Sequence, residues 1–369
     1  MEIRVNRSEF LGELIPMQGI VERKTTIPVL SHLLLTARED RLNLAATDLD
    51  VSLTSWCEAD VKDGGGIAVQ AKKLLEIIRS LTADEVLLVQ EEPRVLTIRS
   101  GKSRFKVHGL APDDFPTLPQ VEDTAQVEIP FGDFRRMVSK ILFAVSAEES
   151  RFQLNGALLK LKDGSMEMVA TDGHRLALVE GGLEGSVGAS NGQESVLVPR
   201  KALQELQRLE GEGKLAYRRG EHHLSFGLGR RELICRILEG TFPDYERVIA
   251  KDNDKKVLFE RKALVEAVQR AALMTGDRAR AVRLQFTSDQ VVISAANSDL
   301  GEAVEEVNCD YEGPEFRVGI NPDYLRDFLG AVETDRIRLE LKDENTQCVG
   351  YPMDGPDTRY LCVIMPMRI

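Results

Sequence analysis

The feature that most constrains this chain is a threefold internal repeat. Residues 2–10, 127–134 and 257–264 open alike, each with a short strand pattern that runs into an amphipathic helix pattern. In every helix two apolar residues lie four positions apart, which places them on one face. These pairs are Phe10/Leu14, Phe134/Val138 and Leu264/Val268. Since the period is about 125 residues, each unit is predicted to be a domain rather than one turn of a solenoid.

Further markers recur within each unit. One strand per unit ends in a small polar turn, and these turns are Thr47-Asp48, Thr171-Asp172 and Asn297-Ser298. A second helix is expected within residues 67–81, 196–209 and 316–332. Gly101 and Gly229 mark equivalent hairpin turns in the first two units. Each unit therefore holds two helices and about eight short strands, an α+β layout with the helices packed on one sheet face.

The repeat defines three predicted domains, which are residues 1–123, 124–252 and 253–369. Polar, charged linkers are expected near residues 119–125 and 250–256. The Gly-, Ser- and Asn-containing stretch at residues 181–193 indicates a surface loop inside the middle domain.

An almost wholly apolar segment, Leu361–Ile369, closes the chain. Chain ends are usually solvated, so this one is predicted to be a buried edge strand or one wall of an apolar groove. A last core strand remains an alternative for Leu361–Ile364. For Met365–Ile369 a binding surface is favoured, because Pro366 stops a ladder and methionines give adaptable contacts.

Composition narrows the functional classes. The chain has no run of about 18 apolar residues, which predicts no membrane span, and its start lacks the pattern of a signal peptide. Five scattered cysteines without a CxxC pair favour reduced thiols in a cytoplasm over a zinc site or disulfide framework. No metal spacing connects His32, His108, His222 and His223, and the last two are expected on opposite faces of one strand. No Gly-rich phosphate loop is present, and no cofactor is predicted.

The formal charge of -12 argues against a simple basic nucleic-acid binder. Four predicted helices nevertheless carry +2 each, and they span residues 67–81, 131–147, 199–209 and 260–280. The other two, at residues 7–24 and 316–331, are neutral, so all six together carry +8 and the rest of the chain -20. These charges are either ordinary solvated helix faces or a helical surface that meets a polyanion without reading its sequence.

A conjunction of motifs links the whole chain to a known family. The motifs are Ala-Thr-Asp-Gly-His-Arg-Leu at residues 170–176, Arg-Phe-Gln-Leu-Asn-Gly at 151–156, Phe-Pro-Asp-Tyr at 242–245 and the terminal Met-Pro-Met-Arg-Ile. Set on three repeated α+β domains, they resemble the beta subunits of bacterial DNA polymerase III, the sliding clamps. The resemblance implies a non-catalytic processivity factor. Two copies would close head to tail into a ring around duplex DNA, with helices lining the hole.

The resemblance also implies partners. They are double-stranded DNA of any sequence, a second copy of the chain, the replicative polymerase, a clamp-loader ATPase, and other polymerases and repair proteins. The protein partners would dock through short linear motifs, typically a glutamine followed by leucine and a terminal leucine-phenylalanine pair. A bacterial cytoplasmic, nucleoid-associated protein without membrane contact is expected.

In the family, these motifs enter a groove between the second and third domains. The matching positions are Leu154, Thr171, Gly173, His174, Arg175, Leu176, Pro243, Arg247, Val248, Asn321, Tyr324, Val363, Met365, Pro366, Met367 and Arg368. The expected apolar cup for the leucine-phenylalanine end is Leu176, Val248, Val363 and Met365. Met367 and Pro366 would hold the glutamine. The expected rim is Arg175, Arg247 and Arg368.

Two other surfaces follow from the resemblance. The expected DNA contacts are Lys24, Lys72, Lys73, Arg200 and Lys201. The expected ring contact joins Phe105 and Val107 to Leu273 and Met274, with Lys73 able to reach the acidic cluster Glu302, Glu305 and Glu306. Lys73 is a candidate for both surfaces, and its role stays open. For Phe105 and Val107 an intradomain core strand is the alternative.

The chain departs from the family at Phe152 and Gln153, where two tyrosines are common, and in the acidic segment Ala147–Ser150. No DNA contact is assigned there, and the effect of Phe152 and Gln153 on peptide preference stays open.

Two other functional classes are weighed against the clamp. One is a protein-binding scaffold with this fold that does not encircle DNA. The other is a hydrolase that uses Asp172 and His174. The hydrolase is rejected because the Thr47-Asp48 turn repeats the arrangement without a histidine.

Overall fold

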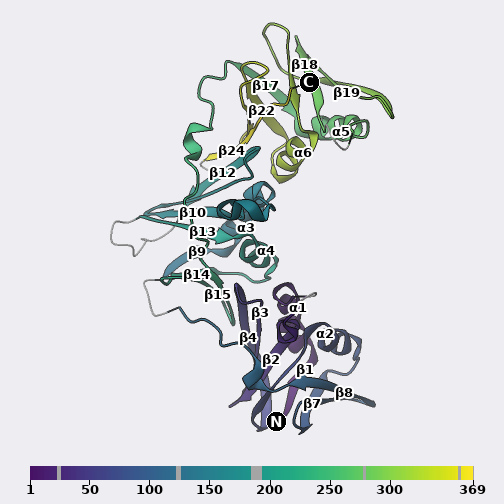
Figure 1. Ribbon diagram of the computed structural model, residues 1–369, viewed down its shortest axis with the longest axis vertical. Coiled ribbons are helices and arrows are strands. Elements are labelled where there is room, and N and C mark those ends of the chain that lie inside the picture. The colour runs from purple at the N-terminus through teal and green to yellow at the C-terminus, as the bar shows by residue number, and fades with distance from the viewer. Residues whose placement is uncertain (23–25, 122–125, 184–192, 277–279, 356–358, 369) are drawn as a thin grey trace. The chain divides into compact units, whose positions relative to one another are not determined.

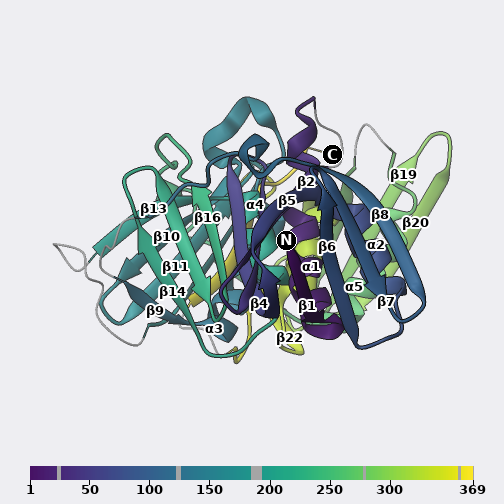
Figure 2. The same ribbon diagram turned by 90° about the horizontal axis from the view of Figure 1, so that it is seen from below.

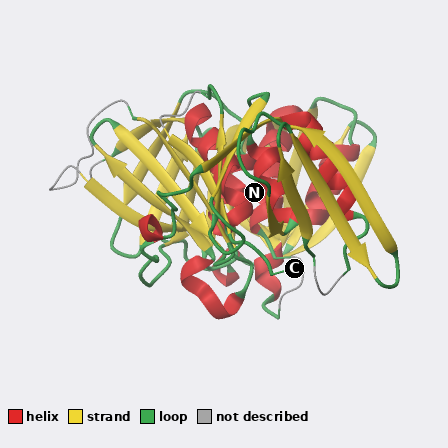
Figure 3. Cartoon of the chain, turned by 90° about the horizontal axis from the view of Figure 1, so that it is seen from above, coloured by secondary structure: helices red, strands yellow, loops and turns green. Residues whose placement is uncertain are grey.

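The fold is taken from a computed structural model that describes residues 1–22, 26–121, 126–183, 193–276, 280–355 and 359–368. Within these residues, six α-helices and twenty-four strands follow one another, two helices and eight strands in each third of the chain. More residues lie in strands than in helices, as Figure 3 shows by colour. Two compact units form, one from residues 1–132 and 201–237 and the other from residues 133–200 and 238–369.

The first unit contains one sheet of twelve strands in the order β1-β6-β7-β8-β5-β2-β3-β4-β16-β15-β14-β9. The first third contributes β1 (Glu2–Asn6), β2 (His32–Arg38), β3 (Arg41–Thr47), β4 (Val51–Asp63), β5 (Gly65–Gln70), β6 (Glu85–Glu92), β7 (Val95–Ser100) and β8 (Ser103–Leu110). The middle third contributes β9 (Val127–Pro130), β14 (Lys214–Arg219), β15 (His223–Leu228) and β16 (Arg231–Arg236). β16 pairs antiparallel with β4, so one ladder joins the first third of the chain to the middle third.

Helices α1 (Arg7–Ile20) and α2 (Ala71–Ser80) pack side by side in this unit (Figure 1). α1 begins where it does because the Asn6 side chain accepts hydrogen bonds from the backbone N–H groups of Ser8 and Glu9. Phe10 and Leu14 are fully buried, which confirms the predicted apolar face. The helix ends before residue 24, as Val21 adopts an extended backbone.

A buried polar network ties α1 to the middle third of the chain. Glu13 accepts hydrogen bonds from Arg231, with Nε 2.8 Å from Oε2 and Nη2 3.0 Å from Oε1. The carboxylate of Glu205 lies against Gly19, where an added Cβ would come within 1.7 Å of Oε2. Glu205 belongs to α4 (Arg200–Arg208). Burial raises the pKa of Glu205, although Arg208 beside it acts in the opposite direction.

The second unit holds a sheet of eight strands, in the order β13-β10-β11-β12-β24-β23-β22-β17, and a sheet of four, in the order β20-β19-β18-β21. The eight strands are β10 (Gly156–Lys162), β11 (Ser165–Thr171), β12 (Arg175–Gly182), β13 (Gln193–Pro199), β17 (Lys255–Glu260), β22 (Arg336–Leu341), β23 (Cys348–Pro352) and β24 (Arg359–Ile364). The four are β18 (Val282–Thr287), β19 (Gln290–Asn297), β20 (Gly301–Asn308) and β21 (Phe316–Ile320). The helices are α3 (Phe131–Ile141), α5 (Arg261–Ala272) and α6 (Pro322–Ala331).

For Leu361–Ile364 the structure confirms the alternative of a core strand, and the expectation of an edge strand is wrong. β24 is an interior strand that pairs with β12 on one side and β23 on the other. The apolar composition of β24 reflects this position. The strand has a neighbouring strand on each side and both of its faces are buried, so none of its side chains form a solvated row.

Several predicted boundaries also shift. α5 ends at Ala272 instead of continuing to residue 280, because Leu273, Met274 and Thr275 donate to carbonyls three residues back and tighten the last turn. α3 ends at Ile141 rather than 147 and continues as a short 3₁₀ turn. The last residues of the second linker, 255 and 256, lie in β17. β15 begins at His223, so His222 precedes the strand. Most of the predicted loop at 181–193 lies outside the described residues.

The repeated polar turns share one hydrogen-bonding scheme. Asp48 Oδ1 accepts from the N–H of Val51 at 2.7 Å, and Asp172 Oδ1 accepts from the N–H of Arg175 at 3.0 Å. In the third repeat the side chain of Asn297 takes the same part, accepting from two backbone N–H groups. The turns therefore close strand ends, which confirms their structural interpretation.

Candidate functional site

The C-terminal tail is tied to the second unit beyond the end of β24. The N–H of Met365 donates to the His174 carbonyl at 2.9 Å, and the N–H of Met367 donates to the Gly319 carbonyl at 2.8 Å. Pro366 lies between these two bonds and has no N–H to donate. Met365 is 36% exposed. The β11–β12 turn and strand β21 therefore order the tail and leave the Met365 side chain accessible.

Four side chains cross one face of the sheet next to this tail. Thr171 lies opposite Leu176, Leu176 opposite Val363, and Val363 opposite Val349. We call these four residues the groove row. Its apolar members belong to one buried cluster, against which the half-buried Val248 packs. Leu176, Val248 and Val363, three residues of the expected cup, thus lie together.

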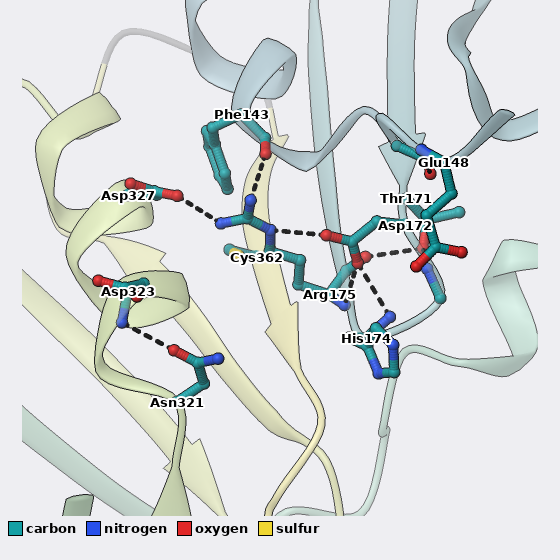
Figure 4. A network of polar contacts seen from close by, with 12 residues as sticks. Phe143, Glu148, Thr171, Asp172, His174, Arg175, Asn321, Asp323, Asp327 and Cys362 are labelled. Atoms are coloured by element: carbon teal, nitrogen blue, oxygen red, sulfur yellow. Dashed lines mark hydrogen bonds and ion pairs between the residues drawn. The ribbon is translucent and has the colours of Figure 1, made fainter. Parts of the chain in front are cut away.

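Arg175 joins the turn after β11 to helix α6 (Figure 4). Its Nε donates to Asp172 Oδ2 at 3.0 Å, Nη1 donates to Asp327 Oδ2 at 2.6 Å, and Nη2 donates to the Phe143 carbonyl at 2.5 Å. The guanidinium carbon also lies 4.5 Å from the centre of the Tyr324 ring. Burial acts to lower the pKa of Arg175, but the bond to Asp327 and the two carboxylates raise it.

This geometry separates Arg175 from the other two arginines of the expected rim. The Arg175 side chain is 11% exposed, and all three nitrogens of its guanidinium donate to protein acceptors. The Arg247 side chain is 85% exposed and is paired with Asp244 at 2.6 Å. Arg368 is exposed as well. Arg247 and Arg368 are accessible to a partner, whereas Arg175 holds the site together from within.

Helix α6 brings two more expected residues to the same place. Asn321 caps the helix by accepting from the N–H of Asp323 at 2.9 Å (Figure 4). Tyr324 follows on the first turn, and its ring stacks on His174 with centroids 6.4 Å apart. Gly173 between the strands has φ +90, and a Cβ there would lie 2.7 Å from the Arg151 guanidinium. This position therefore requires glycine.

The remaining expected groove residues come from two other segments. Pro243, Arg247 and Val248 lie on the segment between β16 and β17, and Leu154 is buried near the start of β10. Sequence reasoning missed Asp327, which bonds Arg175. Asp327 could have been found from its spacing, because a residue three positions after Tyr324 lies on the same face of the helix.

The expected DNA-contacting residues differ in accessibility. Lys72 and Lys73 are exposed on α2, where both lie near Glu76. Arg200 is half-buried, and Lys24 lies outside the described residues. The Lys201 ammonium donates to the Asp48 carboxylate and to the Ile20 carbonyl, so it is already engaged within the chain.

The charge asymmetry persists with the observed helix bounds. Helices α2, α3, α4 and α5 each carry three basic residues and one acidic residue, whereas α1 and α6 each carry one basic and two acidic residues. The net positive charge of the helices in an acidic chain does not depend on where the predicted helices ended.

Two strand edges carry the residues expected at the ring contact. Among the described strands, β20 pairs only with β19, in a long hairpin (Figure 2). β8 pairs with β7 at residues 103–108 and with β5 only at Gly109 and Leu110, so residues 103–108 have one edge without a strand partner in the described chain. Phe105 and Val107 are half-buried on one face of β8.

The residues expected on the other side of the ring contact are only partly accessible. Leu273 is 72% exposed just beyond α5, while Met274 is half-buried. Glu305 binds the Arg270 guanidinium through both oxygens, at 2.7 and 2.9 Å, and Glu306 accepts from Gln290. Glu302 is exposed. The sequence reasoning missed two exposed apolar residues near this surface, Leu300 and Val304.

Comparison with known families covers nearly the whole chain. The models of the DNA polymerase III beta subunit match as N-terminal domain at residues 1–119, central domain at 128–244 and C-terminal domain at 246–368. This chain belongs to the DNA polymerase III beta subunit family. The three α+β units of the repeat are therefore three beta-subunit domains, and the fold expected from the resemblance is confirmed.

Full-length relatives agree with this assignment. The beta sliding clamp of Pseudomonas aeruginosa is 36% identical over 372 residues, and that of Caulobacter vibrioides is 34% identical over 378, with both chains covered completely in each case. The crystal structure of the P. aeruginosa beta subunit superposes with a TM-score of 0.92 at 34% identity over all of both chains. A clamp from Bartonella birtlesii bound to griselimycin reaches 0.94 at 32% identity, again over both full chains.

Beta subunits are accessory proteins without a catalytic site, and membership in the family applies this to the present chain. The oxygens of Thr171 and Asp172 accept the backbone N–H groups of the turn, which is a structural use. In the part of the chain that is described, no three His, Cys, Asp or Glu side chains group as they would around a metal ion. None of the described helices is long and apolar enough to cross a membrane.

Proposed function

We propose that this chain is a sliding clamp, two copies of which encircle duplex DNA and tether the replicative polymerase. The full-length match to three successive beta-subunit domains carries the proposal. The charge distribution supports it, because positive helices in a chain of net charge -12 suit a ring that faces DNA with its helices. A ring holds DNA by topology, so weak contacts to phosphates suffice and no base is read. The clamp acts at the nucleoid in a bacterial cytoplasm.

The proposed domains are residues 1–123, 124–252 and 253–369. The family-model matches and the sequence repeat support this division. The compact units divide the chain differently because the ladders β4–β16 and β12–β24 continue a sheet from one third of the chain into the next.

The proposed ring contact pairs the open edge of β8 with that of β20 in a second copy. Phe105 and Val107 then meet Leu273 and Met274, and the exposure of Leu273 supports this role. Exposed Arg104 and Lys106 on β8 oppose the acidic cluster Glu302, Glu305 and Glu306, with Lys73 in reach of the same cluster. Two such contacts between unlike edges close a ring.

The proposed DNA contacts are Lys24, Lys72, Lys73, Arg200 and Lys201. The exposure of Lys72 and Lys73 on α2 supports these two. Lys201 must release Asp48 before it can reach a phosphate, so its contribution is the smallest of the described residues in this set.

The proposed groove takes the linear motifs of the polymerase, the clamp loader, and other polymerases and repair proteins. The apolar members of the groove row, the accessible Met365 and the exposed Arg247 and Arg368 support an apolar cup with a basic rim. Leu154, Gly173, His174, Asn321, Tyr324, Pro243, Pro366 and Met367 complete the proposed lining.

Sedimentation of the purified chain, with and without residues 365–369, tests the proposal together with binding of a Gln-Leu-Ser-Leu-Phe peptide. A dimer of about 82 kDa, twice the chain mass of 41.1 kDa, that loses only peptide binding on truncation supports a ring with a groove built by the tail. Retention on nicked circular DNA that is lost on linearisation supports encirclement. A stable monomer without such retention favours the scaffold that does not encircle DNA.

A further inference from the structure

The sheet face that carries the groove row has two more rows beside it. Leu158, Val169, Leu178 and Leu361 lie opposite one another across four strands and form the core row. Lys160, Glu167, Glu180 and Arg359 occupy the next register positions and form the charged row. The face therefore changes from apolar to charged over four residues of each strand, and the charged row is the row farthest from the groove row.

The segment at residues 238–250 lies over the core row and carries one wall of the groove. Ile249 and Tyr245 are buried in the same apolar cluster as Leu178 and Leu361. Phe242 packs edge-on against Tyr245, with ring centroids 6.3 Å apart. This wall, from Pro243 to Val248, has a single 3₁₀ turn at Tyr245–Arg247 and no strand pairing of its own in the described structure. Its position must therefore come from side chains.

The Tyr245 hydroxyl supplies such an anchor on the charged row. It donates to Glu167 Oε1 at 2.5 Å and accepts from Lys160 Nζ at 2.5 Å. The Lys160 ammonium also lies 4.6 Å from the centre of the Tyr245 ring. Tyr245 is 5% exposed, and its hydroxyl is held on the charged row, the row farthest from the groove row. Burial and the bond to Glu167 raise the pKa of Tyr245, so the hydroxyl remains a proton donor.

A second anchor lies one residue further along. Glu246 accepts from Arg359, at the far end of the charged row, with 3.1 Å between Oε1 and Nη1. Hydrogen bonding to Arg359 lowers the pKa of Glu246. Tyr245 and Glu246, which are adjacent in the wall, are thus attached to opposite ends of the charged row. These two attachments fix the distance of the wall from the sheet and its orientation across the strands.

We propose that Tyr245 is a positioning residue for peptide binding, which holds the Pro243–Val248 wall against the groove row through Lys160 and Glu167. The inference rests on the proposed peptide groove and explains why the Phe-Pro-Asp-Tyr motif ends in tyrosine. Without the hydroxyl, the wall occupies its binding arrangement for a smaller fraction of the time. Apparent affinity falls in proportion to that fraction.

The test is Tyr245→Phe in the full-length chain, with a fluorescein-labelled Gln-Leu-Ser-Leu-Phe peptide as the probe. The expected result is a Kd about tenfold higher, which corresponds to about 1.4 kcal/mol, with slower association and an unchanged dissociation rate. The matched control is Tyr360→Phe. Tyr360 is a buried tyrosine on the opposite face of β24, and its hydroxyl donates to the Lys140 carbonyl. The control lowers stability but leaves the Kd unchanged.

A Kd of Tyr245→Phe within twofold of the unaltered chain overturns the inference, as does an equal loss of affinity in Tyr360→Phe. Should Tyr245→Phe fail to fold, Lys160→Met decides, since it removes the ammonium that donates to the Tyr245 hydroxyl: a Kd raised about threefold supports the inference and an unchanged Kd overturns it. If the unaltered chain itself does not bind the peptide, the proposed groove fails and the positioning role fails with it. That outcome is distinct from a groove that binds equally well without the hydroxyl.

Discussion

Replacing Arg175 with methionine removes every polar contact of its guanidinium while keeping an unbranched apolar side chain in place. Asp172 and Asp327 then lose their shared cation, and the Phe143 carbonyl loses a donor. Breaking a buried ion pair costs about 3–5 kcal/mol. The Asp327 side chain is 37% exposed, so water replaces part of the loss, and about 3 kcal/mol is expected.

The loss should be local, because Arg175 joins the β11–β12 turn to α6 and leaves the first unit untouched. Native-state hydrogen exchange measures it directly as a drop in the opening free energy of amides in α6 and at residues 171–176. The matched control is Arg247→Met, which removes an exposed arginine with one ion pair to Asp244. It should change stability by less than about 1 kcal/mol.

Peptide binding separates this account from the direct rim contact that the family resemblance implies. If Arg175 acts by positioning, Arg175→Met loses stability and affinity together, while Arg247→Met loses affinity alone. The positioning role is refuted if Arg175→Met weakens peptide binding but leaves hydrogen exchange at α6 unchanged. Arg175 would then contact the peptide directly at the rim of the groove.

Three further predictions concern stability and assembly. Gly19→Ala should lower the free energy of unfolding by about 1–3 kcal/mol, because the new Cβ meets the Glu205 carboxylate. In a Glu205→Ala background the same substitution should raise the free energy of unfolding by about 0.5–1 kcal/mol. A change of the same sign in both backgrounds would disprove the contact. Burial raises the pKa of Glu205 above its ordinary value of 4.5, so its ionisation costs stability as pH rises through the folded-state pKa. In urea titrations across pH, Glu205→Gln should match the unaltered chain below pH 4.5 and exceed it above. Leu273→Asp should sediment as a monomer and Ile15→Asp, at another exposed apolar position, as a dimer; dimers of both would place the ring contact elsewhere.

Local rules made much of the fold predictable. The apolar pairs Phe10/Leu14 and Leu264/Val268 are fully buried, as a spacing of four residues on a helix requires. Gly101 and Gly229 have φ of 54 and 60, the left-handed backbone that their hairpin turns demand. These features depend on neighbours within a few residues.

The groove was predictable only through resemblance, and its internal construction was not predictable at all. Arg175 and Asp327 are 152 residues apart, and Tyr245 meets Lys160 across 85. Nothing in the local pattern distinguishes an arginine that points outward from one that is held inside, as Arg247 and Arg175 are. The end of the second linker shifted because residues 255 and 256 pair with the distant strand β22. Helix α5 ended early for a local reason, since the residues after it donate to carbonyls three positions back.

By itself the sequence determined the repeat, the period of each helix and strand, the polar turns and the excess of positive charge on four helices. All of these follow from steric and hydrophobic preferences that act over a few residues. Only the tertiary structure decided that Leu361–Ile364 lie in an interior strand, that the Arg175 guanidinium is bound by two carboxylates, and that Tyr245 reaches the charged row. Strand order and buried ion pairs depend on contacts between residues that are far apart in the sequence. Many strand pairings are compatible with the same local pattern, and packing of the core selects one of them.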